Sequence, residues 1–234
     1  MPGRVLPPWR CARAAADNGA VATTGIWFLA GYVVGSIPIG LIVGRLAGVD
    51  IRRYGTGNIG ASNMMRNVGL LPAAVVGVGS FLQGLGPAWA AAELTGSPPA
   101  TAAAAVGSVV GYGWSFLLAF RGGRAVGAAT GALAALSPVG LIPLLGLYAL
   151  GGLLRQPALG VLLGLLAFLG SLGFGTHPWA IAVGAVLVVA AVLLKRLAGV
   201  RGDLRANADR HAGVLVDRLV FDRRPGQRLV GRND

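Results

Sequence analysis

The sequence predicts an all-α, polytopic membrane protein with about seven transmembrane helices. Three observations lead to this prediction. Of the 234 residues, 55% are hydrophobic and only 12% are charged, and a typical soluble domain carries about twice that charged fraction. The apolar residues run in blocks of about 20, which is the length that a helix needs to cross the hydrocarbon core of a bilayer. The basic residues lie between these blocks and near the two ends of the chain.

The first three hydrophobic elements are separated by polar connections. They cover residues 26–47, 70–94 and 100–120. Glycine is abundant within them, as at Gly31, Gly35 and Gly40 of the first element. Helices in lipid associate through close packing, and small residues let their backbones approach each other. We therefore expect these glycines to lie at contacts between helices.

The second half of the hydrophobic region holds four more elements. Residues 125–154 form one long apolar stretch that contains Pro138 and Pro143, and proline disfavours a continuous helix. We divide this stretch near Ser137 into a short fourth element and a fifth. The sixth and seventh elements cover residues 158–174 and 178–194.

The distribution of basic residues indicates how the chain is oriented. Arg or Lys follows the first, third, fifth and seventh elements, whereas the connections after the second, fourth and sixth contain neither residue. Cytoplasmic connections are enriched in Lys and Arg, so this alternation predicts that the odd-numbered connections and the C-terminus are cytoplasmic. Arg4, Arg10 and Arg13, before the first element, are the exception to the rule.

Composition divides the chain into three parts. Residues 1–25 are predicted to be a disordered N-terminal extension, residues 26–196 a transmembrane domain, and residues 197–234 a basic cytoplasmic tail. The formal net charge is +12. Because the basic residues lie in loops and tails, this charge favours anionic headgroups or substrates as partners and argues against nucleic acid.

The sequence predicts no disulfide, metal site or cofactor. Cys11 is the only cysteine and lies outside any cluster, so no intrachain disulfide can form. His177 and His211 are the only histidines, and neither fits a metal-ligand spacing. The sequence does not define an oligomeric state.

The connection after the first element carries the strongest chemical signal. Residues 54–66 contain three glycines within six positions, together with Thr56, Asn58, Ser62 and Asn63. Closely spaced glycines let backbone N–H groups converge on a phosphate, and nearby arginines can clamp it with two hydrogen bonds. The arginines here are Arg52, Arg53 and Arg66. The alternative is an ordinary turn between helices.

The connection after the third element is a second candidate anion site. Arg121 and Arg124 bracket Gly122 and Gly123, and a small-residue helix is expected to follow. Exposed N–H groups at a helix N-terminus attract anions. A positively charged anchor with a tight turn is the equally plausible alternative. Both connections are predicted on one membrane face, which suggests a reaction between two phosphorylated or acidic molecules.

In this order and spacing, the two loops resemble the bacterial glycerol-3-phosphate acyltransferases that use acyl-phosphate as donor. The resemblance covers residues 31–194. The family's first loop reads Gly-Ser-Gly-Asn-x-Gly-Ala-x-Asn, and here only its Ser is replaced, by Thr56. The family's second loop has a Gly-Gly pair between two lysines, and here both lysines are arginines.

The chain departs from the family pattern at several positions, so we identify it as a divergent member. The family's His and Pro before the second loop are Tyr112 and Ser115, and its Asp-x-x-Lys motif on the second helix has Ser80 and Gln83 at its charged positions. The family's Ser before the sixth element aligns with Ala158, and its His and Asn after the last span align with Arg196 and Gly199. His211 lies too far along the chain to replace the missing histidine.

The resemblance implies transfer of an acyl group from acyl-phosphate to glycerol-3-phosphate, which gives lysophosphatidic acid for phospholipid synthesis. It also implies a multi-pass protein of the bacterial inner (plasma) membrane, with membrane lipid as a partner. We assign catalysis to Thr56 and Arg66. The residues assigned to substrate binding are Arg52, Gly57, Asn58, Gly60, Ala61, Asn63, Arg121, Gly122, Gly123 and Arg124.

Two alternatives stay open at this point. The first is a catalytically impaired relative that binds anionic lipid or phosphate, which the departures from the family pattern favour. The second is an anion transporter, which spans interrupted by Pro38 and Pro138 would fit. No inverted repeat supports the transporter, and the charges within spans, Arg45 and Glu93, lie near span ends.

Overall fold

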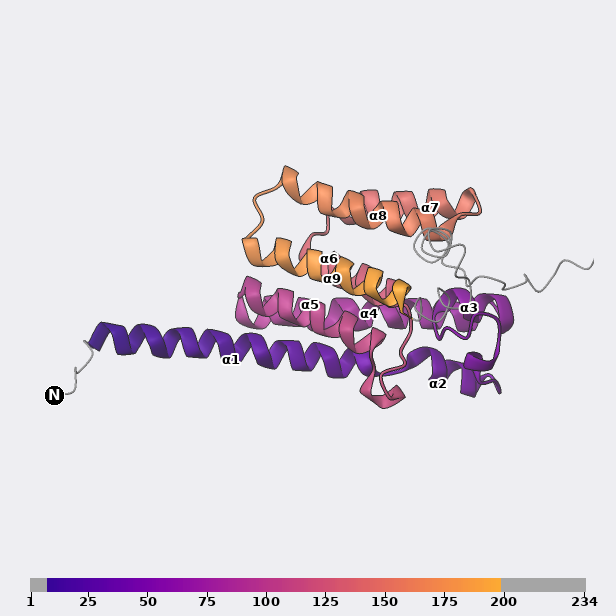
Figure 1. The fold of residues 1–234 in the computed structure, drawn as a ribbon, viewed down its shortest axis with the longest axis horizontal. Helices are drawn as coiled ribbons and strands as arrows, with labels where there is room; N and C mark the ends of the chain where they lie inside the picture. The colour runs from indigo at the N-terminus through magenta and orange to yellow at the C-terminus, as the bar shows by residue number, and fades with distance from the viewer. Residues whose placement is uncertain (1–7, 199–234) are drawn as a thin grey trace, which may run out of the picture.

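The computed structural model describes residues 8–198, and every regular element in that range is a helix. Figure 1 shows how these helices are arranged. In chain order they are α1 (Pro8–Ser36), α2 (Ile39–Leu46), η1 (Ile51–Arg53), α3 (Ala61–Asn67), α4 (Leu70–Thr95), α5 (Pro98–Gly113), η2 (Phe116–Leu118), α6 (Val126–Leu136), α7 (Leu141–Leu153), α8 (Pro157–Ser171), η3 (Leu172–Phe174) and α9 (Trp179–Leu197).

The helices have the lengths and surfaces of a polytopic membrane protein. Within the described residues, five helical segments are long and apolar enough to cross a bilayer, and α6 and α7 are shorter apolar helices. Many large apolar side chains face outward, as Leu29, Val78 and Leu166 do, which suits contact with lipid. Together these helices occupy the places of the seven predicted elements, and the all-α membrane fold is confirmed.

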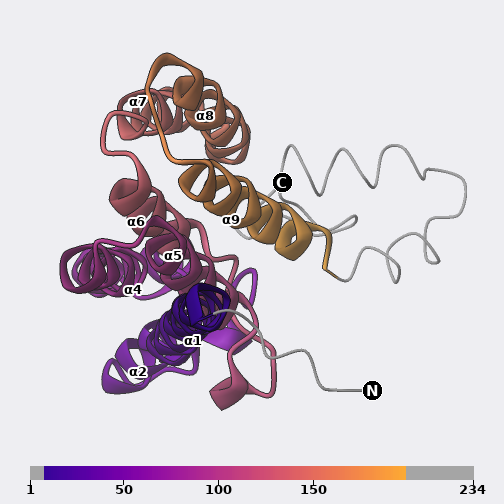
Figure 2. The ribbon, with the colours of Figure 1, turned by 90° about the vertical axis from the view of Figure 1, so that its left-hand side faces the viewer.

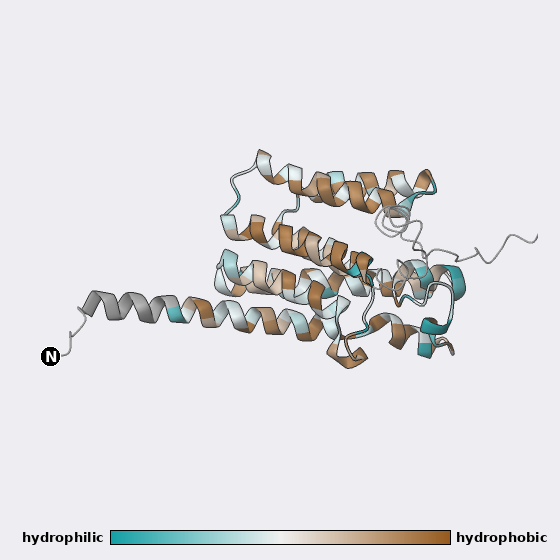
Figure 3. Ribbon diagram, viewed as in Figure 1, coloured by the Kyte–Doolittle hydropathy of each residue, from teal (hydrophilic) through white to brown (hydrophobic). Residues whose placement is uncertain are grey.

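The helices form layers across the bundle. In Figure 2, α1 and α2 lie at one edge, α4, α5, α6 and α9 form the middle, and the α7–α8 hairpin lies at the other edge. The larger apolar core lies among α4, α5, α6 and α9 and extends to the facing sides of α7 and α8. The polar residues gather at one end of the bundle, around η1 and α3, as Figure 3 shows. The loops that the sequence analysis singled out therefore lie at one end of the apolar bundle.

The predicted first element is divided in two, and it starts earlier than expected. α1 begins at Pro8, inside the segment 1–25 that the sequence predicts to be a disordered extension, and it ends at Ser36. Pro38 lies between α1 and α2, and because proline lacks an N–H group it cannot continue the hydrogen-bond pattern of a helix. The rest of the chain, residues 1–7 and 199–234, lies outside the described residues, and with it most of the predicted tail.

Two further boundaries show how local sequence limits the helices. The predicted division near Ser137 is confirmed: α6 ends at Leu136, and Ser137 is extended as expected for a residue before proline. The third predicted element ends earlier than expected, because α5 stops at Gly113 and the short helix η2 follows. This early end leaves an irregular segment between α5 and α6, which becomes part of the site.

Glycines hold α1 and α5 in direct backbone contact. A Cβ atom at Gly31 or Gly35 of α1 would collide with a carbonyl of α5, and one at Gly107 or Gly111 of α5 would collide with a carbonyl of α1. Two glycines four residues apart on each helix create this close approach. The expectation that Gly31 and Gly35 lie at helix contacts is thus confirmed, and this contact fixes α1 against the middle of the bundle.

Polar side chains of α4 and of the segment after α5 donate hydrogen bonds to the carbonyl groups exposed where α1 ends. The buried Gln83 donates from Nε2 to Val34 O at 2.8 Å and to Ile37 O at 2.7 Å. The buried Ser115 donates from Oγ to Ser36 O at 2.6 Å. Backbone groups without water must be satisfied inside the protein, so these side chains make the break between α1 and α2 possible within an apolar bundle.

The α1–α5 contact predicts the effect of adding one methyl group. Gly35→Ala places a Cβ against the Ser108 carbonyl, and we expect it to destabilise the fold by about 1–3 kcal/mol, the usual cost of overpacking. Gly25→Ala on the same helix meets nothing within 4 Å and is the matched control. Thermal unfolding in detergent should show a lower Tm for the first variant only. Equal Tm values for both variants would contradict the proposed close contact.

Candidate functional site

Asn63 organises the glycine-rich loop between η1 and α3. Its side chain is only 3% exposed. From Nδ2 it donates to Tyr54 O at 3.0 Å and to Asn58 O at 2.9 Å. Its Oδ1 accepts from the Thr56 N–H at 3.1 Å and from Asn67 Nδ2 at 3.0 Å. The amide group thus ties both sides of the loop to α3, and the loop is built around this one side chain.

Two glycines let the loop fold tightly around Asn63. Gly55 and Gly57 have φ values of 53° and 68°, in the left-handed region, where glycine has no steric cost. A Cβ at Gly55 would lie 2.5 Å from Asn63 Oδ1 and 2.7 Å from Asn67 Nδ2. Between the two glycines, Thr56 Oγ1 accepts from the Asn58 N–H at 3.4 Å. Gly55 and Gly57 are therefore required for the conformation of the loop itself.

The structure brings the two predicted loops into contact. A Cβ at Gly123 would lie 2.7 Å from Tyr112 Cε1, 3.1 Å from Ile59 Cγ1 and 3.2 Å from Asn58 Oδ1. The Gly123 N–H donates to Tyr112 O at 3.1 Å, and Gly122 lies directly against the same carbonyl. Only glycine allows these approaches. Gly123 brings the second loop against Asn58 and Ile59 of the first, and Gly122 packs it on the end of α5.

Arginines from both loops line a cleft of about 710 Å³, which we name the cationic cleft. A cavity of this size is in the range of small-molecule sites. Arg52 comes from the first loop and Arg121 from the second, as the sequence suggested. The cleft is lined by Pro38, Leu41, Arg45, Asp50, Arg52, Arg53, Leu117, Leu118, Ala119 and Arg121. Four guanidinium groups against one carboxylate make it strongly positive, and one of its walls is apolar.

Two of these arginines are absent from the site predicted by sequence. Arg45 reads as a charge at the end of a span, and Arg53 as a flanking residue. The break at Pro38 changes this reading, because it turns the last residues of the first element into the separate helix α2, which carries Arg45 in its last turn. The signal in the sequence was Arg45, which follows Pro38 by seven positions at the end of the first element. This spacing could have indicated a separate short helix that carries a basic residue.

An ion pair orients Arg52 in the cleft. Arg52 Nη2 and Nε lie 2.6 Å and 2.9 Å from the Asp50 carboxylate, which also accepts from the Arg52 N–H. The hydrogen bond from the Arg52 guanidinium lowers the pKa of Asp50 from 3.8 to about 2, and the Asp50 carboxylate in turn raises the pKa of Arg52. Arg52 is exposed and Asp50 is half-buried, so the ion pair contributes little to stability, and its main effect is to orient the Arg52 side chain.

The remaining predicted residues are not among those that line the cleft. Arg66 is exposed in the last turn of α3, and Arg124 is half-buried before α6. Gly60 and Ala61 stand at the start of α3. The structure therefore brings Arg52 and Arg121 together in the cleft, and Asn58 and Gly123 together where the two loops meet. Thr56 and Arg66 belong to the first loop and to α3 and do not line the cleft.

The end of α9 approaches the start of α8. The side chain of Arg196 is buried, and its Nη1 donates to Ala158 O at 3.1 Å. The neighbouring Lys195 places Nζ 4.9 Å from the centre of the Trp114 ring, which is a cation–π contact. Arg196 and Ala158 are therefore in contact. These are the two positions that the family resemblance aligns with a His and a Ser. Gly199, aligned with the Asn, lies outside the described residues.

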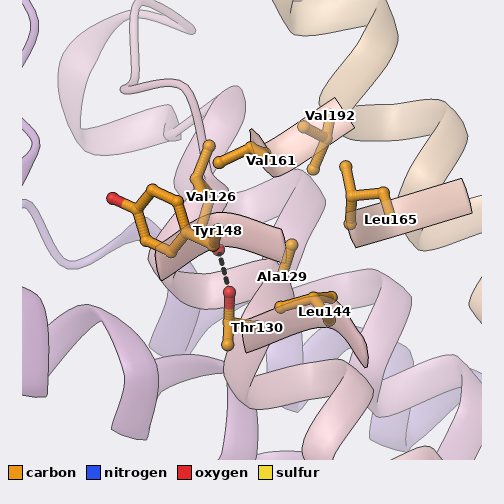
Figure 4. A pocket seen from close by; sticks show the side chains of 8 residues that line it. All are labelled: Val126, Ala129, Thr130, Leu144, Tyr148, Val161, Leu165 and Val192. Carbon is orange, nitrogen blue, oxygen red and sulfur yellow. Dashed lines mark hydrogen bonds between the residues drawn. The ribbon is translucent and has the colours of Figure 1, made fainter. Parts of the chain in front are cut away.

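A second cavity is too small to hold a substrate. Figure 4 shows this crevice among α6, α7, α8 and α9, with Thr130 Oγ1 donating to Val126 O at 2.9 Å. Its volume of about 10 Å³ has room for roughly one water molecule. It is lined by Val126, Ala129, Thr130, Leu144, Tyr148, Val161, Leu165 and Val192. Within residues 8–198, no group of three or more His, Cys, Asp or Glu side chains could hold a metal ion.

Comparison with known proteins supports the sequence resemblance. The family model of glycerol-3-phosphate acyltransferase matches residues 25–201. A glycerol-3-phosphate acyltransferase of Trichlorobacter lovleyi is 34% identical over 175 residues, which is 74% of this chain and 90% of that protein. One of Rubrobacter xylanophilus is 46% identical over 123 residues, so the alignment spans 52% of this chain and only 60% of that relative.

A solved structure has the same arrangement of helices. It is the crystal structure of PlsY (YgiH), an integral membrane glycerol 3-phosphate acyltransferase, in its glycerol 3-phosphate form. The two folds agree with a TM-score of 0.69 at 26% identity, over 81% of this chain and 92% of that one. Given the matched residues, the shared multi-pass membrane fold and the two joined loops, the chain belongs to the glycerol-3-phosphate acyltransferase family.

Proposed function

We propose that this protein transfers an acyl group from an acyl-phosphate to glycerol-3-phosphate and so produces lysophosphatidic acid. Membership of the family supports this activity. The structural neighbour PlsY is known in a glycerol 3-phosphate form and in a lysophosphatidic acid form, which are a substrate and the product of the proposed reaction. The reaction belongs to phospholipid synthesis in a bacterial inner membrane.

The cationic cleft is the observation that carries the proposal. Both substrates carry a phosphate group, and guanidinium groups bind phosphate with paired, charge-assisted hydrogen bonds. The cleft gathers Arg52 and Arg53 from the first loop, Arg121 from the second, and Arg45 from α2. We assign Arg52 and Arg121 to the two phosphates. Holding two anions side by side lowers the entropic part of the barrier.

The chemistry needs little covalent help from the protein. The hydroxyl oxygen of glycerol-3-phosphate attacks the carbonyl carbon of the acyl-phosphate, and the bond from that carbon to the phosphate oxygen breaks. The proton of the hydroxyl passes to a phosphate oxygen, and inorganic phosphate leaves. Arginines that neutralise the charge developing on the leaving phosphate stabilise the transition state. The acyl chain lies along the helices.

The glycine-rich loop completes the proposed site. Gly60 and Ala61, at the start of α3, offer backbone N–H groups to a phosphate beside the cleft. The N–H groups of Gly57 and Asn58 donate to Tyr54 O and Thr56 Oγ1, so Gly57 shapes the loop and Asn58 contributes its side-chain amide to binding. We keep for Thr56 and Arg66 the catalytic roles that the family resemblance implies; Thr56 lies between the two left-handed glycines of the loop, and Arg66 lies in the last turn of α3. Asn63 holds the loop in its conformation, because its side-chain amide forms hydrogen bonds with the loop backbone.

The second loop is proposed to complete the phosphate site from the other side. Gly122 and Gly123 bring its backbone against Asn58 and Tyr112, and Arg121 and Arg124 flank the pair. The Lys and Arg pattern along the chain supports a cytoplasmic position for both loops and for the C-terminus.

A second candidate function is phosphate binding without turnover. The buried Gln83 and Arg196 stand at family positions that carry Lys and His, and both donate hydrogen bonds to backbone carbonyls. These side chains therefore support the fold where the family pattern has ionisable groups. Binding of a phosphate analogue by a folded protein that transfers no acyl group would favour this alternative over the enzyme.

Removing a cleft arginine should weaken catalysis selectively. We expect Arg52→Ala and Arg121→Ala each to lower kcat/KM by roughly 10- to 100-fold, since one charged hydrogen bond contributes about 1.5–3 kcal/mol. The assay follows acyl transfer from palmitoyl phosphate to glycerol-3-phosphate in membranes. Arg155→Ala, an exposed arginine between α7 and α8, is the matched control and should retain full activity. A folded wild-type protein that transfers no acyl group would contradict the proposed function.

Complementation tests the catalytic roles of Thr56 and Arg66 in cells. In a bacterial strain depleted of its own glycerol-3-phosphate acyltransferase, the wild-type gene should restore growth. Thr56→Ala and Arg66→Ala should not, because the proposed site uses both side chains as polar groups beside the reacting phosphate. Immunoblotting of membranes checks that all variants accumulate equally. Normal growth with either variant would remove that residue from the catalytic group.

The role assigned to Asn63 is structural, and it predicts a distinct phenotype. Asn63→Ala leaves the loop carbonyls and the Thr56 N–H without their partner, which costs about 1–3 kcal/mol for each buried group left unpaired. We expect faster tryptic cleavage after Arg52 and Arg53 together with lost activity. Ser62→Ala, at the exposed neighbouring position, should cleave at the wild-type rate. An inactive Asn63→Ala protein with normal protease resistance would argue for direct substrate contact instead.

A further inference from the structure

The segment from Ser115 to Arg121, here named the η2 loop, exposes apolar side chains beside the cationic cleft. Ser115 is buried and anchored to the end of α1 through its hydrogen bond to Ser36 O. Leu117 and Phe120 are 54% and 61% exposed. Figure 3 shows this segment as a brown projection on the flank of the bundle, next to the junction of α1 and α2. Such exposure suits lipid better than water.

Hydrogen bonds within the η2 loop satisfy several of its backbone N–H groups, which suits a segment that faces lipid. The N–H groups of Leu118 and Phe120 donate to Ser115 O at 3.1 Å and 2.8 Å, and that of Arg121 donates to Leu118 O at 3.0 Å. Irregular backbone within a membrane is tolerated only where its polar groups find partners. The ring of Phe116 also stacks on Tyr32 of α1, with centroids 5.9 Å apart, so the loop is braced against the bundle.

Strained backbone holds the outer turn of the loop. Ala119 and Phe120 have φ values of 49° and 62°, in a region that residues other than glycine rarely adopt. Conformations of this kind persist where surrounding contacts enforce them, and they gather at functional sites. The turn leaves Phe120 on the outer surface while the next residue, Arg121, lines the cleft.

The η2 loop is also one wall of the cationic cleft. Leu117, Leu118 and Ala119 line it from this side, and Pro38 and Leu41 from the other. The arginines supply the rest of the lining. A cavity with an apolar wall and a cluster of fixed positive charges matches an amphiphile with an apolar chain and a phosphate head. A free phosphate or glycerol-3-phosphate would leave the apolar wall unused.

We infer that the cationic cleft opens sideways to the adjacent leaflet, with the η2 loop embedded in lipid as its wall. The cleft receives a single-chain, phosphate-bearing amphiphile directly from the bilayer, with the chain against Leu117 and Leu118 and the phosphate on the arginines. That this amphiphile is the long-chain acyl donor rests on the proposed function. Delivery from the leaflet itself rests on the exposure and lining of the loop.

The position of the loop can be measured without any activity. Cys11 is the only cysteine, so Cys11→Ser combined with Phe120→Cys gives a protein that carries one fluorescent label, reconstituted in nanodiscs containing brominated lipids. We expect the lipids to quench this label as strongly as one on Leu166→Cys, an α8 position that is 53% exposed. A label on Tyr54→Cys in the glycine-rich loop should stay unquenched. A Phe120→Cys label that behaves like the Tyr54→Cys label would overturn the inference.

A titration of the same labelled protein distinguishes the source of the phosphate. Lysophosphatidate added to the nanodiscs should shift the emission of the Phe120→Cys label, and inorganic phosphate at the same concentration should not. Equal responses to both ligands, or none to lysophosphatidate, would show that the cleft does not select a membrane amphiphile. This outcome is independent of whether the protein catalyses acyl transfer.

Donor preference gives the kinetic test. Leu117→Asn should raise the ratio of KM for palmitoyl phosphate to KM for butyryl phosphate at least tenfold, because only the long chain needs the apolar wall. Phe120→Ala should raise the same ratio less. Leu166→Asn, with matched exposure, should leave it unchanged. A ratio unaffected by Leu117→Asn would contradict the inference. If the wild-type protein transferred no acyl group from either donor, only the proposed function would be contradicted. The labelling results would then decide whether the η2 loop lies in lipid.

Discussion

The need to satisfy every backbone polar group inside an apolar bundle governs this structure. Where α1 ends at Ser36, the following proline interrupts the helix and leaves carbonyl groups exposed. Gln83 of α4 and Ser115 after α5 donate hydrogen bonds to these carbonyls. These hydrogen bonds allow α2 to be a separate helix from α1. The α1–α2 junction and α2 then supply Pro38, Leu41 and Arg45 to the lining of the cationic cleft. The site thus depends on polar side chains that need not touch a substrate.

Small residues provide the second condition for the site. The glycines of α1 and α5 bring two backbones into contact, and Gly123 brings the second loop against the first. A larger residue at any of these places would separate elements that carry the charged groups. Glycine therefore does two different things in one chain, packing helices in lipid and assembling two distant loops into one surface.

Sequence patterns predicted most of the helices but only part of the site. Apolar blocks and prolines marked the seven elements and the division near Ser137, because hydropathy and proline act locally. Pro38 indicated an interruption of the first span but not a separate helix after it, since the break is offset by hydrogen bonds from Gln83 and Ser115, which lie far away in sequence. For the same reason Arg45 read as the end of a span. The composition of the glycine-rich loop was informative, yet it could not tell that Asn63 points inward, which only the folded loop defines.

The chemical identity of the positive charges in the cleft has a consequence for how the site responds to acidity. All four cations are guanidinium groups, which stay protonated at any physiological pH. The one carboxylate, Asp50, has a pKa lowered to about 2, so its pairing with Arg52 is complete above its ordinary pKa of 3.8 and is lost only as the pH falls through about 2. The electrostatic potential of the cleft is therefore constant over the whole range in which bacteria grow. A phosphate ligand, by contrast, loses its second proton near pH 6, so its own charge changes over this range while that of the cleft lining does not.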